Sequence, residues 1–419
     1  MKIPLERKYL DRPLWILFAI LLVVAVISLF SAGSTLAYAD DSSIGPIAKQ
    51  ILFLVAGVIL AALVQYLPTW VVRFGGYVVL AAAIGCLYLM LIPNNPFVVR
   101  ANEAGRWFNL FGIVQFQPSE LAKLGLVIVV ADLLARIKNP EDEKKYFFVT
   151  LGLTGLTCLP IFFGNLSTVV LMMGIIILMW FLARISWKYI LSVIGVLIVG
   201  VVLGYCVVEF GYVRQNRRID SGPLKRAMVW VDRVDNMFGE MSDDFDIKTA
   251  LDDEHYQRTI AKVAVARGGR SPFGVLPGNS IERDYLPLAY MDYIFAVIVE
   301  ETGIVGAALL IFLYLAVLFR ACLISNRYSD YSAMLMVMGL ALMLTCQALI
   351  SMAVSVGLGP VTGQPLPLIS KGGTSVLITS LYFGIMMGVA REQKELREHQ
   401  QMVKNDSYND APTITLEPN

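Results

Sequence analysis

The chain has 419 residues, of which 57% are hydrophobic and 16% charged, and its formal net charge is +1. Because a soluble domain carries about 25% charged residues, this composition excludes an ordinary soluble globular protein. The near-zero net charge gives no support for a protein that binds nucleic acid. Apolar residues occur in runs of about 18–22, each long enough to cross the roughly 30 Å hydrocarbon core of a membrane as a helix. The sequence therefore predicts an all-α, polytopic membrane helix bundle.

About ten transmembrane helices are predicted from these runs. They lie near residues 13–32, 49–67, 75–93, 118–136, 146–164, 167–183, 189–208, 292–319, 332–354 and 374–390. The first run follows several basic residues and precedes Ala37, Tyr38 and Ala39, which are typical of a signal-peptidase site. Its apolar core of about 20 residues exceeds the roughly 7–15 of a cleaved signal peptide, so an uncut first span is predicted.

The basic residues of the short loops predict the orientation of the bundle. When the spans are counted alternately, the basic segments all fall on one side: the N-terminus, the turn with Arg73, the loop 136–145, the link with Arg184 and Lys188, the loop 320–327 and the tail after Arg391. Links between spans that carry many basic residues face the cytoplasm in most membrane proteins. Both termini are therefore predicted to be cytoplasmic.

A hydrophilic insert, residues 211–290, lies between the seventh and eighth spans and is predicted to be extracytoplasmic. Residues 256–264 have helical spacing and residues 267–272 are typical of a turn, so we expect an ordered cap. Residues 1–390, including this cap, form the predicted transmembrane domain. Residues 391–419 form a predicted cytoplasmic tail that is disordered beyond a short helical extension. No internal repeat is visible, which argues against a transporter built from inverted halves.

Several kinds of chemistry are not supported by the sequence. All five cysteines lie in apolar runs without metal-ligand spacing, so we interpret them as core residues rather than as disulfides or zinc ligands. The sequence contains no Walker loop, no dinucleotide fingerprint and no His/Cys ligand set, so nucleotide-driven chemistry is not expected.

The first polar cluster on the predicted outer face contains Arg106 and Trp107, followed by residues 117–123 (QPSELAK) at the start of the fourth span. Proline suits the first turn of a helix, and Glu120 and Lys123, three residues apart, can pair on one helix face. An interfacial ion pair with an aromatic anchor would explain this cluster as well as a role in chemistry would.

The second cluster joins residues 277–280 (PGNS) to Asp284 and to Asp292 at the mouth of the eighth span. An aspartate in that place is costly unless it faces water or a partner. The two carboxylates could converge on one cavity, one as general base and the other binding a cation or a sugar hydroxyl. Aspartate is also a good helix N-cap, and this structural interpretation stays open.

The third and fourth clusters lie inside the eighth span and before the tenth. Glu300 and Glu301 are acids within a membrane span, and are candidates for function or for a bond to a neighbouring helix. Gly303 indicates a local break or close packing. Residues 360–375 (PVTGQPLPLISKGGTS) are typical of a rigid re-entrant loop that lines a cavity, with backbone N–H groups free to meet an anion and Lys371 beside them.

In this order on ten spans, the four clusters resemble the SEDS family of peptidoglycan glycosyltransferases, which includes the FtsW proteins of cell division and the RodA proteins of cell elongation. The resemblance covers about residues 13–390. Its most specific segments are GRW at 105–107, QPSELAK at 117–123, LP at 286–287, DYIFA at 292–296 and PLPLISKGG at 365–373.

The resemblance implies polymerisation of lipid II at the outer face of the bacterial cytoplasmic membrane, with inversion and with undecaprenyl diphosphate as leaving group. Asp292 aligns with the family's essential aspartate and is the predicted general base. Asp284 falls at a second acidic position that matters in the division branch. Arg106, Lys123 and Arg226 are expected to offset the charge of the diphosphate. The remaining substrate-binding candidates are Trp107, Glu120, Asn279, Ser280, Ser370, Lys371, Gly372 and Gly373.

The chain departs from the family's pattern in three places. Family members commonly read LPE-x-HTD, whereas this chain has Leu288, Tyr290 and Met291 before the aspartate, so no role is assigned to those positions. The usual Ser-Tyr-Gly-Gly has Lys371 in place of the tyrosine. A lysine common in the division branch is Thr362 here, and Lys371 is a hypothetical substitute for it.

Residues 278–280 (GNS) resemble the division branch more than the elongation branch, so a role in cell division is predicted. The alternatives are an elongation polymerase, a lipid II flippase, or a scaffold that recruits a synthase without catalysis. The family implies a class B penicillin-binding protein as transpeptidase partner, together with other division proteins. No cofactor is otherwise indicated, although the clustered outer acids are compatible with a divalent cation, Mg²⁺ or Mn²⁺.

Overall fold

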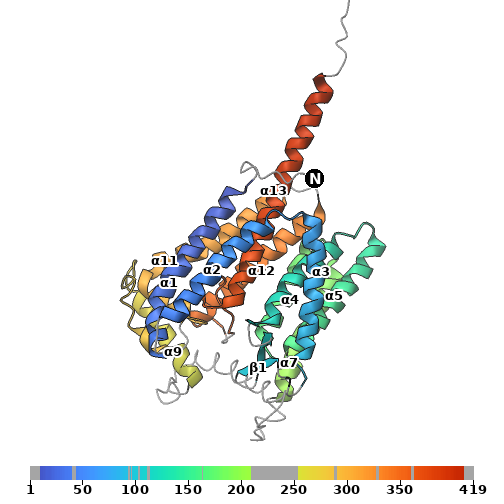
Figure 1. Ribbon diagram of the computed structural model, residues 1–419. Coiled ribbons are helices and arrows are strands. Elements are labelled where there is room, and N and C mark those ends of the chain that lie inside the picture. Colours follow the sequence, from blue (N-terminus) through green and yellow to red (C-terminus); the bar gives the residue numbers. More distant parts are fainter. Residues whose placement is uncertain are drawn as a thin grey trace, which may run out of the picture.

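The computed structural model describes residues 10–39, 44–92, 95, 97–101, 104–110, 114–162, 164–208, 253–286, 290–326, 330–359 and 363–409. In this part of the chain, ten long helices form one bundle, and each coincides with a predicted span (Figure 1). They are α1 (Arg12–Ala39), α2 (Ile44–Val64), α3 (Thr69–Leu89), α4 (Pro118–Leu134), α5 (Pro140–Phe162), α6 (Leu166–Leu182), α7 (Trp187–Val208), α11 (Ile294–Ser325), α12 (Tyr331–Ser355) and α13 (Gly373–Asn409).

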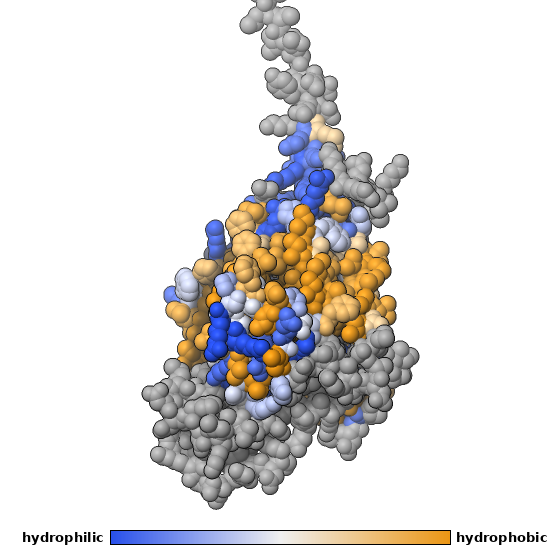
Figure 2. Space-filling model, turned by 90° about the vertical axis from the view of Figure 1, so that its left-hand side faces the viewer, coloured by the Kyte–Doolittle hydropathy of each residue, from blue (hydrophilic) through white to orange (hydrophobic). Residues whose placement is uncertain are grey.

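Eight of these helices are long and apolar enough to cross a membrane, and the other two, α4 and α6, have 17 residues each. On the face of the molecule shown in Figure 2, hydrophobic side chains cover a broad middle region, with hydrophilic side chains above it and in a patch below it. Helix α12 lies at the centre, packed against α4, α6, α11 and α13, and most of its residues are buried. These features confirm a multi-pass membrane helix bundle, while the total of ten crossings stays a prediction.

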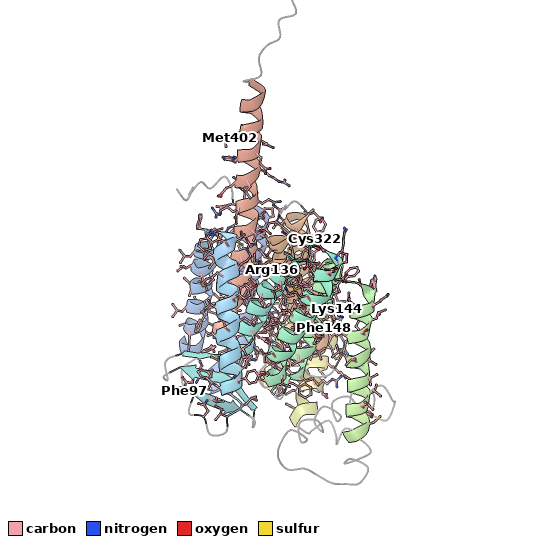
Figure 3. All side chains as sticks on the ribbon, turned by 90° about the vertical axis from the view of Figure 1, so that its right-hand side faces the viewer. Phe97, Arg136, Lys144, Phe148, Cys322 and Met402 are labelled. Carbon is pink, nitrogen blue, oxygen red and sulfur yellow. The ribbon has the colours of Figure 1, made fainter. Side chains whose placement is uncertain are left out.

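One end of the bundle gathers the elements that were predicted to be cytoplasmic. An Arg73 nitrogen lies 3.3 Å from an Asp330 oxygen, and Arg320 pairs with Asp11 at 2.5 Å. Helix α13 leaves the bundle at this end and carries Met402 well beyond it (Figure 3). The helix therefore extends much further into residues 391–419 than the short extension predicted from the sequence.

The opposite end carries a small antiparallel sheet that the all-α prediction did not include. Its strands are β1 (Val98–Ala101), β2 (Ala104–Leu110) and β3 (Val114–Phe116), in the order β1-β2-β3. Phe108 is buried and its ring contacts those of Phe97 and Phe116. Figure 3 shows Phe97 at the end of the molecule away from Met402. The aromatic contacts hold the strands together, and the sheet contacts the bundle at α4 and α13, so Arg106 and Trp107 lie at the outer end.

The described part of the insert forms α9 (Asp253–Gly268) and α10 (Glu282–Tyr285). Helix α9 confirms the helical spacing of residues 256–264, and it packs against α11. The section that follows α9 enters a break in α11: Val275 N–H donates to the Glu300 carbonyl and Leu276 N–H to the Glu301 carbonyl, both at 2.9 Å. The insert thus supplies the hydrogen bonds that a broken membrane helix loses.

The break itself lies at Gly303, whose φ of 67° and ψ of −163° are not helical. A Cβ atom at Gly303 would collide with the Gly274 nitrogen and with the carbonyl oxygens of Ser271 and Pro272. Gly274 also has a positive φ, 65°, and faces the same backbone. The structure therefore confirms both alternatives for Gly303, a local break and close packing.

Helix α13 is held against α2 by small residues spaced four apart. Ser380, Gly384 and Gly388 of α13 face α2, and a Cβ atom at Gly384 would lie 2.9 Å from the Ala61 Cα. Such stripes let two membrane helices approach closely. This contact fixes the start of α13, where the loop of the fourth cluster ends.

Candidate functional site

Asp292 lies at the outer mouth of α11, two residues before the first residue of the helix. The N-cap position is Tyr293, whose side chain makes no capping hydrogen bond. The Asp292 carbonyl accepts a hydrogen bond from the Ser355 hydroxyl at 3.4 Å, which ties it to α12, and the residue is half-buried. The N-cap position of α11 is thus assigned to Tyr293 rather than to Asp292, and the role of the Asp292 carboxylate stays a prediction.

Lys371 lies beside the segment that leads to Asp292. Its N–H donates to the Tyr290 carbonyl at 2.9 Å, and its Nζ lies 4.7 Å from the centre of the Tyr290 ring. A cation over an aromatic ring is held by the ring's electrostatic field. The structure thus joins the second and fourth clusters, because Lys371 contacts the residue that lies two positions before the candidate base in the sequence.

The fourth cluster forms a loop that re-enters the bundle: Gln364, Leu366, Leu368 and Ser370 are all buried. The Ser370 hydroxyl accepts a hydrogen bond from the Leu366 N–H at 2.8 Å, and the N–H groups of Ile369 and Ser370 donate to the Leu366 carbonyl. The prediction of free N–H groups is wrong for these three positions, because the loop uses them to close on itself.

Free backbone donors lie slightly later, at the start of α13. A Cβ atom at Gly373 would lie 2.8 Å from the Phe53 ring, so glycine lets the turn formed with Gly372 pack against α2. Within the described ranges, no atom accepts a hydrogen bond from the N–H of Gly373, Thr374 or Ser375. The first-turn N–H groups of a helix attract anions.

Glu120 and Lys123 form a buried ion pair rather than an exposed one. The Lys123 Nζ lies 2.7 Å from a Glu120 oxygen and donates to the Gln347 Oε1 at 2.7 Å. Gln347 in turn donates to the Pro365 carbonyl at 3.0 Å. Because Lys123 has no exposed surface, this chain of contacts connects α4 and α12 to the re-entrant loop.

Replacing Gln347 with leucine should lower both stability and activity. The change leaves the Pro365 carbonyl without its donor and removes one partner of the buried Lys123 ammonium. Each unsatisfied buried group costs about 1–3 kcal/mol. Thermal unfolding in detergent measures the loss of stability. The control is Leu342→Gln, which adds an amide elsewhere on α12 instead of removing one. An unchanged melting temperature for Gln347→Leu would contradict the supporting role.

Glu300 and Glu301 are buried and bind the insert. Glu300 accepts from the Ser280 hydroxyl, from the Ile281 N–H at 3.2 Å and from Arg267 at 3.3 Å. The Ser280 side chain is therefore buried, and its hydroxyl is already bonded to Glu300. Asn279 is exposed and donates to the Val275 carbonyl at 3.1 Å. The two acids act in this structure as anchors.

Asp284 lies in α10, and its side chain is outside the described residues. The position of α10 is well defined by its neighbours: Leu286, directly after the helix, is buried against Tyr293 and Ala296 of the α11 entrance. The insert thereby brings the backbone of Asp284 toward the segment that carries Asp292.

The remaining predicted site residues lie in the sheet or outside the described part of the chain. Val99 pairs with Trp107 and Arg100 with Gly105, so Arg106 is the extra residue of a β-bulge. Bulges commonly redirect side chains beside functional sites. Trp107 is half-buried. Arg226 belongs to residues 209–252, outside the described residues.

No three His, Cys, Asp or Glu side chains among those described lie close enough together to hold a metal ion. A divalent cation such as Mg²⁺ or Mn²⁺ therefore stays a prediction, and the reaction proposed below relies on the chain's own residues.

Several residues of this region escaped the sequence interpretation. Gln347 could have been found, because it is an amide in an otherwise apolar span. The Tyr314 hydroxyl donates to the Pro367 carbonyl at 2.6 Å, and Gln364 donates to the Thr168 hydroxyl at 2.7 Å. These contacts join distant spans, and no local spacing signals them.

The fold and the site define a polytopic membrane protein with a polar centre built at one end of its helix bundle. The family model described as "Cell cycle protein" (FTSW_RODA_SPOVE) matches residues 11–395. The chain belongs to this FtsW/RodA/SpoVE family.

Named relatives and solved structures match nearly the whole chain. It is 27% identical over 401 residues to the peptidoglycan glycosyltransferase MrdB of Escherichia coli K12, covering 93% of this chain and 96% of that protein. It is 30% identical over 401 residues to a probable peptidoglycan glycosyltransferase FtsW of Hahella chejuensis, covering 91% and 90%.

The fold resembles two solved structures. One, described as "Structural coordination of polymerization and crosslinking by a peptidoglycan synthase complex", has a TM-score of 0.70 and 24% identity and covers 92% of this chain and 98% of that one. The other, RodA of Thermus thermophilus, has a TM-score of 0.59 and 23% identity and covers 92% and 97%. Both likenesses support the same membrane helix bundle.

Proposed function

We propose that the protein is a peptidoglycan glycosyltransferase that polymerises lipid II at the outer face of the bacterial cytoplasmic membrane. The family and the names of its relatives support this activity. The observation that carries the proposal is the place of Asp292 at the mouth of α11, where its carbonyl is bonded to Ser355 of α12 and where Lys371 is bonded to the nearby Tyr290.

In the proposed reaction, the acceptor sugar hydroxyl attacks the anomeric carbon of the donor. The hydroxyl proton passes to the Asp292 carboxylate, the new C–O bond forms, and the bond to undecaprenyl diphosphate breaks with inversion. The bonding electrons leave with the diphosphate. Lys371, Arg106 and the first-turn N–H groups of α13 are the proposed counter-charges, while Lys123 supports the loop.

A role in cell division is the more specific part of the proposal. Residues 278–280 and the FtsW-named relatives support it. The MrdB-named relative is similar at 27% identity, so an elongation polymerase is the second candidate. We also propose a class B penicillin-binding protein as partner, because a solved relative couples polymerization to crosslinking in one complex.

Reconstitution with fluorescent lipid II tests the function. The chain is placed in liposomes with and without the candidate transpeptidase, and products are separated on gels. Glycan strands are expected, and a parallel dye-reduction assay follows movement of lipid II between leaflets. Lipid movement without strands would indicate a flippase instead. Treatment with EDTA, followed by Mg²⁺ or Mn²⁺, tests the predicted cation in the same assay.

A further inference from the structure

Two buried glutamates in the broken part of α11 hold the part of the insert that carries Asp284. Glu301 lies about 10 Å of helix below the start of α11, given a rise of roughly 1.5 Å per residue. It is 3% exposed and accepts hydrogen bonds from the Ser31 hydroxyl and from the Gly278 N–H, the latter at 3.0 Å. A carboxylate is held at this depth only by several partners.

Arg283 completes this anchor from the other side. Its Nη1 donates to the Ser31 carbonyl at 2.7 Å and lies 3.8 Å from the Glu301 carboxylate. Its own N–H donates to the Ser280 hydroxyl at 3.2 Å, and Ser280 also bonds Glu300. Arg283 is thus fixed by α1, by α11 and by the turn before α10.

Asp284 follows Arg283 directly, and the chain is fixed again two residues later. Leu286 is 2% exposed and packs with Tyr293, the residue after Asp292. Helix α10 has only one turn, so two anchors at such short spacing leave its backbone little freedom. The position of Asp284 relative to Asp292 therefore depends on the anchor at Glu301.

We infer that Glu301 and Arg283 are positioning residues that hold Asp284 in place for glycosyl transfer. The inference rests on the proposed function. It assigns the intramembrane acid an indirect role: Glu301 fixes the backbone that carries Asp284 and takes no proton in the reaction. Misplacement of a reacting group by about 1 Å costs on the order of 100-fold in rate.

A double-mutant cycle tests the inference, because coupled residues have non-additive effects. Glu301→Gln, which keeps the shape of the side chain, is expected to lower kcat about 10- to 100-fold. Asp284→Asn should lower it at least as much. The double variant should be within about twofold of Asp284→Asn alone, since Glu301 acts only through Asp284.

The matched control is Asp11→Asn, which removes a buried acid from its pair with Arg320 at the other end of the bundle. It should lower the melting temperature as Glu301→Gln does, and its effect on kcat should multiply with that of Asp284→Asn. The inference would be overturned if the effects of Glu301→Gln and Asp284→Asn on kcat multiplied, or if Asp284→Asn left the rate unchanged. In either case, polymerisation by the wild-type protein would still support the proposed function. A wild-type protein without activity would remove the function and this inference together.

Discussion

Asp292→Asn is expected to lower the rate of lipid II polymerisation by a factor of about 10²–10⁴. The amide has nearly the shape of the carboxylate but cannot take the proton of the attacking hydroxyl. Because the contribution of a general base arises in the transition state, kcat should fall with little change in KM. Strand formation by the purified variant, measured over a range of lipid II concentrations, gives both constants.

The control for this prediction is Asp292→Glu, which keeps a carboxylate and moves it by one methylene. It should retain more activity than the asparagine variant. Both variants should melt close to the wild-type temperature, because Asp292 is only half-buried and each replacement keeps a polar side chain of similar size. Wild-type rates in Asp292→Asn would exclude this residue as the base.

Gly303→Ala is expected to cause the largest loss of stability, about 3 kcal/mol or more. A φ of 67° with a ψ of −163° belongs to a region used almost only by glycine, and strain there costs on the order of 1–3 kcal/mol. The added methyl group would also collide with Gly274 and Pro272 and displace the backbone bonds of Val275 and Leu276. Thermal unfolding and protease sensitivity of the insert both measure the effect.

Gly174→Ala is the matched control. Gly174 lies inside α6, and a Cβ atom there would meet nothing within 4 Å. Alanine at such a place is neutral or stabilises a helix by up to about 1 kcal/mol. Equal stability of the two variants would show that the break in α11 does not require glycine.

The sequence predicted the helices well because their physical signal is local. Each apolar run appears as a helix, and the charge pattern correctly placed Arg73, Arg320 and the tail at one end of the bundle. Gly303 was also found, since a glycine inside a span indicates a local break or close packing.

The contacts between distant segments could not be predicted in this way. The burial of Lys123 depends on Gln347, more than 200 residues later, and the sheet around Trp107 depends on pairing that no apolar run signals. The re-entrant loop was found from its prolines and glycines, but its N–H groups bond within the loop, as at Leu366. A loop cannot be assigned free donors until its own acceptors have been placed.

Helix α13 runs without a break from Gly373, beside the proposed reaction centre, to Asn409, far outside the other end of the bundle. It has 37 residues and contains no proline, so it is a rod about 55 Å long. A displacement of its cytoplasmic end would be transmitted along the helix toward Gly373. The two sides of the membrane are joined mechanically by a single continuous element.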